Sequence, residues 1–116
     1  MPSITSFPPF LGTTNAIIAN GQTTSGAVDL AGTSLVGIQM PATFSGATIT
    51  FQVATSLGGT YQTMIDGSGT TVTRTVSQGK YVMLSPADFA GIQFLKIVSS
   101  ASEGAQRTLE LVCRPI

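Results

Sequence analysis

The clearest pattern of apolar and polar positions lies in residues 47–55. There Ile49, Phe51 and Val53 fall on one face of an extended chain, and threonine and glutamine side chains fall on the other. A period of two residues is typical of a β-strand with one face in a core and the other in solvent. The segment is therefore predicted to be a half-buried strand.

Short segments of the same kind recur along the chain, separated by glycine, proline, asparagine and aspartate residues that favour turns. Besides 47–55, the predicted strands are 16–19, 27–30, 35–40, 60–65, 70–76, 81–84, 92–99 and 107–114. One short helical turn is expected over 85–91, because Pro86 suits the first turn of a helix, and 99–106 is expected to be a surface loop. This spacing predicts an all-β domain, an antiparallel sandwich or a barrel.

Two predicted strands are apolar on both faces. Residues 81–84 are apolar at every position. In residues 92–98, apolar side chains fall on both faces of the predicted strand, with Lys96 among them. Each sheet of a two-layered sandwich has only one inner face, so the outward side of these strands needs a third layer. An N-terminal arm or a partner subunit could supply it.

Residues 1–13 differ from the rest of the chain. Three prolines remove backbone donors and favour an extended conformation, which predicts an N-terminal arm in front of a domain of residues 14–116. The arm carries two aromatic rings beside a proline pair. Exposed rings on a free arm would be a liability, so the arm is expected to dock on a neighbour or on its own domain. The predicted anchor residues that bind the partner are Phe7, Pro8, Pro9 and Phe10.

Composition narrows the classes of function. Charged residues make up 9% of the 116 residues, against about 25% in ordinary domains, and the net charge is zero. No electrostatic field exists to attract nucleic acid or an anionic membrane, so neither is expected as a partner. The chain has 13 glycines and is rich in serine and threonine, yet its mean hydropathy is +0.36. A neutral surface of hydroxyl groups favours self-association, so we expect this one to pack against copies of itself or a host assembly.

Candidates for catalysis and metal binding are few. Histidine is absent, which removes the usual general base and the Ser-His and Cys-His arrangements, so no enzyme activity is expected. The carboxylates at 29, 66, 88, 103 and 110 are too scattered to suggest a glycosidase pair. Residues 66–70, Asp-Gly-Ser-Gly-Thr, resemble part of a calcium loop but lack a distal glutamate, so a hairpin turn is favoured. We expect no cofactor and no metal.

The single cysteine and the absence of targeting patterns both indicate the same cellular compartment. Cys113 cannot form an internal disulfide, and its alternation with Leu109 and Leu111 predicts a small buried side chain. No basic segment leads into an apolar run, and no apolar stretch approaches the roughly 20 residues that span a bilayer. The protein is expected to be made and folded in a cytoplasm.

Two cations interrupt apolar faces. Arg74 lies between Val72 and Val76, and Lys96 lies between Phe94 and Val98. Each could occupy an edge position with its stem lying along apolar surface, or it could pair with a charge across a subunit interface. The sequence leaves both interpretations open.

Two resemblances are carried by particular segments. Residues 50–61, Thr-Phe-Gln-Val-Ala-Thr-Ser-Leu-Gly-Gly-Thr-Tyr, resemble the strand–turn–strand of galactose-binding (discoidin-like) jelly rolls, with Gly58 at the usual aspartate and Tyr61 at the usual tryptophan. Residues 94–97, Phe-Leu-Lys-Ile, resemble a later strand of that fold. Residues 21–30, 35–41 and 85–91 resemble small proteins encoded among tailed-phage virion genes. The resemblances imply a jelly-roll sandwich and a virion component, and they transfer no ligand site.

These observations together predict an antiparallel jelly-roll β-sandwich of eight or nine short strands with an N-terminal arm. The predicted function is that of a phage decoration, or cement, protein on the capsid exterior, assembled in the host cytoplasm. Its expected partners are the major capsid protein and further copies of itself, in a trimer. The alternatives are a tail or head-fibre component and, from another class, a carbohydrate-binding module.

Overall fold

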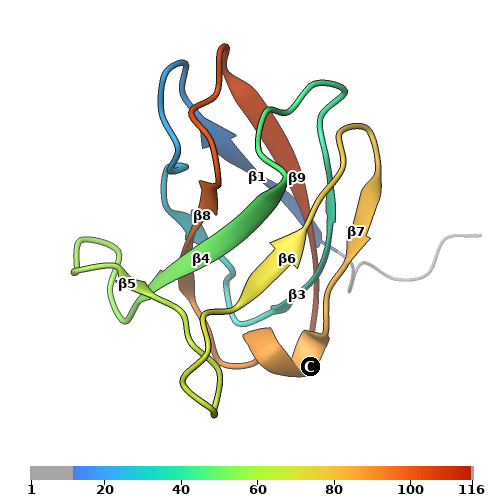
Figure 1. Ribbon diagram of the computed structural model, residues 1–116. Coiled ribbons are helices and arrows are strands. Elements are labelled where there is room, and N and C mark those ends of the chain that lie inside the picture. The colour runs from blue at the N-terminus through green and yellow to red at the C-terminus, as the bar shows by residue number, and fades with distance from the viewer. Residues whose placement is uncertain (1–11, 116) are drawn as a thin grey trace, which may run out of the picture.

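The computed structural model describes residues 12–115. Within this range nine strands form two packed β-sheets, and there is one short helix (Figure 1). The strands are β1 (Gly12–Ile18), β2 (Val28–Asp29), β3 (Ser34–Gln39), β4 (Thr48–Ala54), β5 (Gln62–Thr63), β6 (Thr73–Thr75), β7 (Tyr81–Met83), β8 (Phe94–Ser99) and β9 (Arg107–Arg114). The helix η1 (Pro86–Phe89) is a single 3₁₀ turn, as the proline pattern predicted. The predicted all-β sandwich is confirmed.

The two sheets are antiparallel throughout. Sheet A has the order β1-β9-β3-β7, and sheet B has the order β2-β8-β4-β5, with β6 also paired to β4. Apart from the run β4 to β6, each strand along the chain lies in the opposite sheet from the strand before it. This alternation is the topology of a jelly roll, which confirms the predicted fold class.

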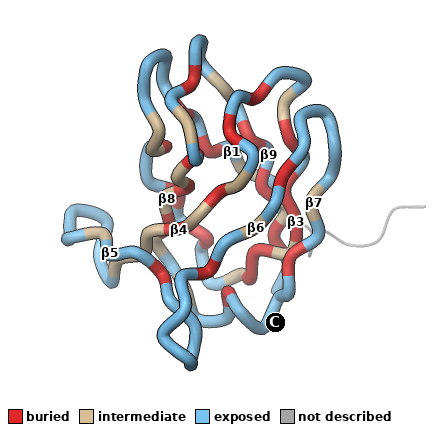
Figure 2. The backbone as a smooth tube through the Cα atoms, in the orientation of Figure 1, coloured by how far each residue is buried: buried red, intermediate tan, exposed pale blue. Residues whose placement is uncertain are grey.

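The core lies between the inner faces of the two sheets. Figure 2 shows the buried positions along the strands, while β5 and most of the peripheral turns are exposed. Ile49 and Phe51 are fully buried, as the alternation in 47–55 predicted. The rings of Phe51 and Phe89 meet edge to face with centroids 5.0 Å apart, so η1 closes one margin of the sandwich.

The first strand begins earlier than the sequence indicated. β1 starts at Gly12, whereas the domain was expected to begin at 14 and its first strand at 16. Residues 12–15 lack apolar alternation, and they are extended because each pairs with β9, from Gly12 opposite Cys113 to Ile18 opposite Arg107. The predicted anchor, Phe7, Pro8, Pro9 and Phe10, lies outside the described residues.

The strands with two apolar faces leave part of their apolar surface uncovered. Met83 is 83% exposed and Tyr81 is 48% exposed on the outer face of sheet A. Phe94 and Val98 are half-buried on the outer face of sheet B. Within residues 12–115 no third layer covers either face.

Candidate interaction surfaces and a buried carboxylate

The outer face of sheet A is ordered in rows that cross all four strands. Strand register places Thr13 beside Val112, Val112 beside Gly37, and Gly37 beside Met83. We call these four residues the central row. Because Leu111 and Cys113 are buried in the core, their neighbour Val112 points outward, and Met83 is exposed at the end of the row.

Tyr81 covers the middle of this face. Its side chain crosses from β7 to β3, and a Cβ at Gly37 would overlap the Tyr81 ring and hydroxyl. Gly37 is itself buried, because the Tyr81 side chain lies over its backbone. The aromatic ring is therefore seated on backbone, which holds an apolar surface flat against the sheet.

The charges of this face lie on β9, on either side of the central row. Glu110 and Arg114 are both exposed and stand two residues before and after Val112. Within residues 12–115 neither forms an ion pair, since the ion pairs found there join Arg74 to Asp88 and Arg107 to Glu103. The face thus presents one charge of each sign around an apolar centre.

The outer face of sheet B contains Lys96, one of the two candidate interface cations. Its ammonium lies 4.4 Å from the centroid of the Tyr61 ring, and the Tyr61 hydroxyl donates a 3.0 Å hydrogen bond to the Leu57 carbonyl. β8 lies between β2 and β4, so the edge position considered for Lys96 is wrong. The half-buried Phe94 and Val98 flank Lys96 on the same face.

Arg74, the other candidate, does lie on an edge strand. Its Nη2 donates to Asp88 Oδ2 at 2.7 Å, which links β6 to η1 across the margin of the sandwich. The pair is partly exposed, so solvent screening limits its contribution to about 1 kcal/mol or less. The structure does not bring Arg74 and Lys96 together, and each has a partner in its own chain. Their role at an interface stays a prediction.

A cleft of about 570 Å³ opens where the end of β4 faces β5 and the segment 91–93. Its lining includes Val53, Thr55, Thr60, Gln62, Ile92 and Gln93. The lining thus combines hydroxyl and amide groups with apolar side chains and contains no charged side chain. Such a lining can donate and accept hydrogen bonds to a neutral polar ligand.

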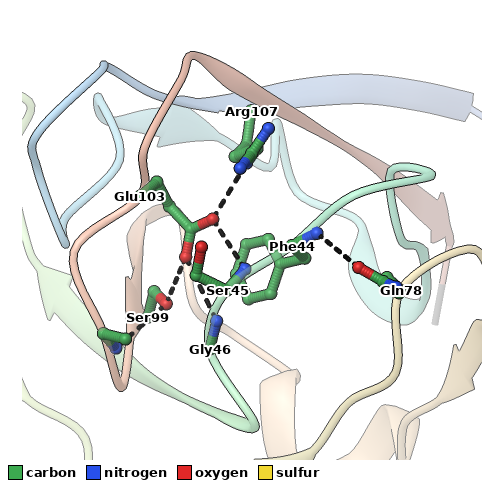
Figure 3. A network of polar contacts seen from close by, with 8 residues as sticks. Phe44, Ser45, Gly46, Gln78, Ser99, Glu103 and Arg107 are labelled. Atoms are coloured by element: carbon green, nitrogen blue, oxygen red, sulfur yellow. Dashed lines mark hydrogen bonds and ion pairs between the residues drawn. The ribbon is translucent and has the colours of Figure 1, made fainter.

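The most connected polar group of the described residues is the carboxylate of Glu103, which is fully buried (Figure 3). Oε1 accepts hydrogen bonds from the Ser45 backbone at 2.9 Å and from Arg107 Nε at 2.9 Å. Oε2 accepts from the Gly46 backbone at 3.2 Å and from Ser99 Oγ at 2.9 Å. The Glu103 backbone also pairs with Gly21 and Gln22, so one residue joins three loops at this end of the sandwich.

Burial alone would raise the pKa of Glu103, but the donors around the carboxylate outweigh it. The Ser45 N–H, the Arg107 guanidinium, the Ser99 hydroxyl and the Gly46 N–H together hold the pKa below its usual value of 4.5. The side chain is therefore ionised at neutral pH, and its arrangement fixes loops rather than offering a reactive group. Its acceptor sites are already occupied.

Sequence reasoning missed Glu103 because it lies in the predicted surface loop 99–106. The expectation is correct for Ser100 and for 104–106, which are exposed, and wrong for Ser99 and Glu103, which are buried. The four-residue spacing of Glu103 and Arg107 is not a signal here, because it brings side chains together on a helix and these residues lie in a loop and a strand. The donors at 45 and 46 come from a distant segment that no local pattern reveals.

The remaining sequence candidates are structural. Asp66 Oδ1 accepts from the Ser68 and Thr70 backbones at 2.8 and 3.1 Å, and Gly69 has φ +82°, so residues 66–70 form the predicted turn. Cys113 is buried as predicted; burial raises the pKa of its thiol, and a hydrogen bond with Thr33 opposes that rise only in part. Within residues 12–115 no three His, Cys, Asp or Glu side chains are placed to share a metal ion.

Comparisons with models of protein families, with curated proteins and with solved structures gave no match. In the described part of the chain, no helix has the length and apolar character needed to cross a membrane.

Proposed function

We propose that this protein is a structural component of a tailed-phage virion, a decoration protein that binds the major capsid protein lattice from outside and stabilises it. The observation that carries the proposal is that both outward faces carry apolar side chains among polar ones, with Tyr81 and Met83 on sheet A and the partly buried Phe94 and Val98 on sheet B. Burial of such surface contributes about 25 cal/mol per Å². A capsid lattice repeats each contact many times, so modest contacts add up.

We assign the capsid contact to the outer face of sheet B. Phe94 and Val98 project from β8, and β8 lies between β2 and β4, so the backbone beneath them is fixed on both sides. Lys96, between them, is held over Tyr61. A surface that is ordered before binding loses little conformational entropy on binding. The predicted anchor, Phe7 to Phe10, would extend this contact along the capsid.

The resemblance of residues 21–30, 35–41 and 85–91 to proteins encoded among virion genes supports the phage assignment. The jelly roll is used by viral capsid and lectin domains, but a fold alone does not determine a function. A tail or head-fibre component would use the same kinds of surface. The position of the protein on the particle distinguishes a capsid decoration protein from a tail or head-fibre component.

The cleft beside β4 and β5 favours a second candidate, a carbohydrate-binding module. Thr55, Gln62 and Gln93 could exchange hydrogen bonds with sugar hydroxyls. The lining offers no aromatic ring for stacking on a sugar. A glycan array compared with the same array for Gln93→Ala tests this candidate; glycan binding that the substitution abolishes would favour it over the capsid role.

Co-sedimentation with capsids that lack this protein tests the capsid role. Val98→Asp places a charge on the outer face of sheet B and should weaken binding more than tenfold. Leu57→Asp places the same charge at a loop position that is 61% exposed, and should change binding less than threefold. Thermal unfolding of both variants checks that they fold. Equal binding by the two folded variants, or no binding by the parent chain, would overturn the proposal.

A further inference from the structure

The outer face of sheet A is left open by the capsid contact proposed on sheet B. Its central row, Thr13, Val112, Gly37 and Met83, is uncharged and crosses the sheet from one edge to the other. Met83, at 83% exposure, is the most exposed large apolar side chain in the described part of the chain. A surface that covers this row would have to be uncharged and largely apolar to match it.

The charges around the row are arranged with an approximate two-fold symmetry. Glu110 and Arg114 stand about 7 Å from Val112 in opposite directions along β9, at about 3.4 Å per residue. A rotation of 180° about an axis along the central row exchanges these two positions. The surface is therefore complementary to itself in charge.

We propose that a second copy of this chain covers this face, and that the two copies pair around a two-fold axis along the central row. Each strand then opposes its own copy in antiparallel orientation. Met83 and Val112 each meet their counterparts at the axis, while Glu110 of each copy faces Arg114 of the other. Such an interface is isologous, with both copies using the same patch.

The size of the face fits a reversible dimer. Three strand spacings and the side chains at their margins make it about 20 Å wide, and β9 makes it about 25 Å long. That corresponds to about 500 Å² from each copy, near the lower limit for a specific interface. The pairing is a property of the isolated chain, and it does not depend on the proposed function. Its two-fold symmetry also differs from the trimer expected from the sequence.

Sedimentation equilibrium of the full chain, from about 5 to about 200 µM, tests the pairing. The mass should rise from 11.9 kDa toward twice that value. Glu110→Arg alone, or Arg114→Glu alone, sets like charges against each other and should weaken dimerisation at least tenfold. The double variant restores opposite charges and should return within about threefold of the parent. A double variant that stays as weak as the single ones would overturn the proposal.

Placement on the axis is tested with Met83→Cys and a short bismaleimide. Rapid covalent dimers are expected for Met83→Cys and not for Leu57→Cys, whose side chain lies in an exposed loop, and the native Cys113 is buried. Equal cross-linking of the two variants would contradict the pairing, as would a trimeric mass or a monomer at every concentration. A full chain that stays monomeric and dimerises only after deletion of residues 2–11 would show that the arm covers the face instead of a second copy.

Discussion

The Nε of Arg107 lies 2.9 Å from Oε1 of Glu103, which places a guanidinium of β9 against a carboxylate that solvent does not reach. The same carboxylate accepts hydrogen bonds from the loop that leads into β4. One charged pair thus joins the two sheets at the end of the sandwich where their loops meet. In the described residues no buried side-chain nitrogen or oxygen lacks a partner, so the network is complete.

Replacement of the carboxylate should be costly. Glu103→Gln keeps the shape of the side chain, but it leaves Arg107 without its counter-charge and sets an NH₂ group against donors. We expect the free energy of unfolding to fall by about 3 kcal/mol, measured by urea denaturation at pH 7 and low protein concentration. Glu110→Gln is the matched control on the exposed face of β9 and should change stability by less than about 0.5 kcal/mol. Similar losses in both variants would contradict this role of Glu103.

The lowered pKa of Glu103 fixes the direction of the pH dependence. The folded state favours the ionised form, so its stabilising effect is complete above the usual pKa of 4.5 and is lost as the pH falls through the lower folded value. The parent chain should therefore lose stability steeply below pH 4.5. Glu103→Gln should show a shallower decline over the same interval. Parallel declines in urea titrations of the two proteins from pH 7 to pH 3 would refute the assignment.

Gly46 is required by the space around it. A Cβ at this position would overlap Ser99 Oγ and lie 3.1 Å from the Phe44 ring, within the hydrogen-bond network of Glu103. Gly46→Ala should therefore destabilise the fold by about 2 kcal/mol, because neighbouring groups must shift. Gly104→Ala, which meets nothing within 4 Å, is the control and should be nearly neutral in thermal unfolding. A neutral Gly46→Ala would show that the loop adapts freely.

The alternation of apolar and polar residues predicted the strands that have one face in the core. β9 has the predicted bounds of 107–114, and β4 lies within the predicted 47–55, because both strands place every second side chain in the core. The order of strands in two sheets could not be derived from pairing rules alone, and the jelly roll was implied only by resemblance. Local sequence does not specify which strands meet across a sandwich.

Other features depend on contacts that local sequence does not contain. β1 is extended at Gly12 because β9 pairs with it, although its first residues carry no apolar pattern. Glu103 is buried because Ser45 and Gly46 supply donors from a segment almost sixty residues away. The sequence left open an edge position or an interface role for Lys96, and the structure places it on a central strand with its ammonium over the Tyr61 ring. Each case is a tertiary contact that outweighs local propensity.

The N-terminal anchor gives a prediction about attachment. The described core is formed by residues 16–113, so deletion of residues 2–11 should leave a folded sandwich that binds capsids more weakly. Phe7→Ala combined with Phe10→Ala should weaken each capsid contact more than tenfold, because a fully buried phenylalanine contributes about 2–3 kcal/mol. Co-sedimentation measures the loss. A change below about threefold would assign the binding to the sheet face alone, and unfolding of the truncated chain would show that the arm belongs to the core.

The most direct test of the central claim is an image of the virion. The proposed role is tested by cryo-electron microscopy of phage particles assembled with this chain and of particles assembled without it. We expect the difference density to be a jelly-roll sandwich, repeated regularly on the outer surface of the capsid, with the outer face of sheet B against the major capsid protein. Difference density confined to the tail, or no difference between the two particles, would contradict the account.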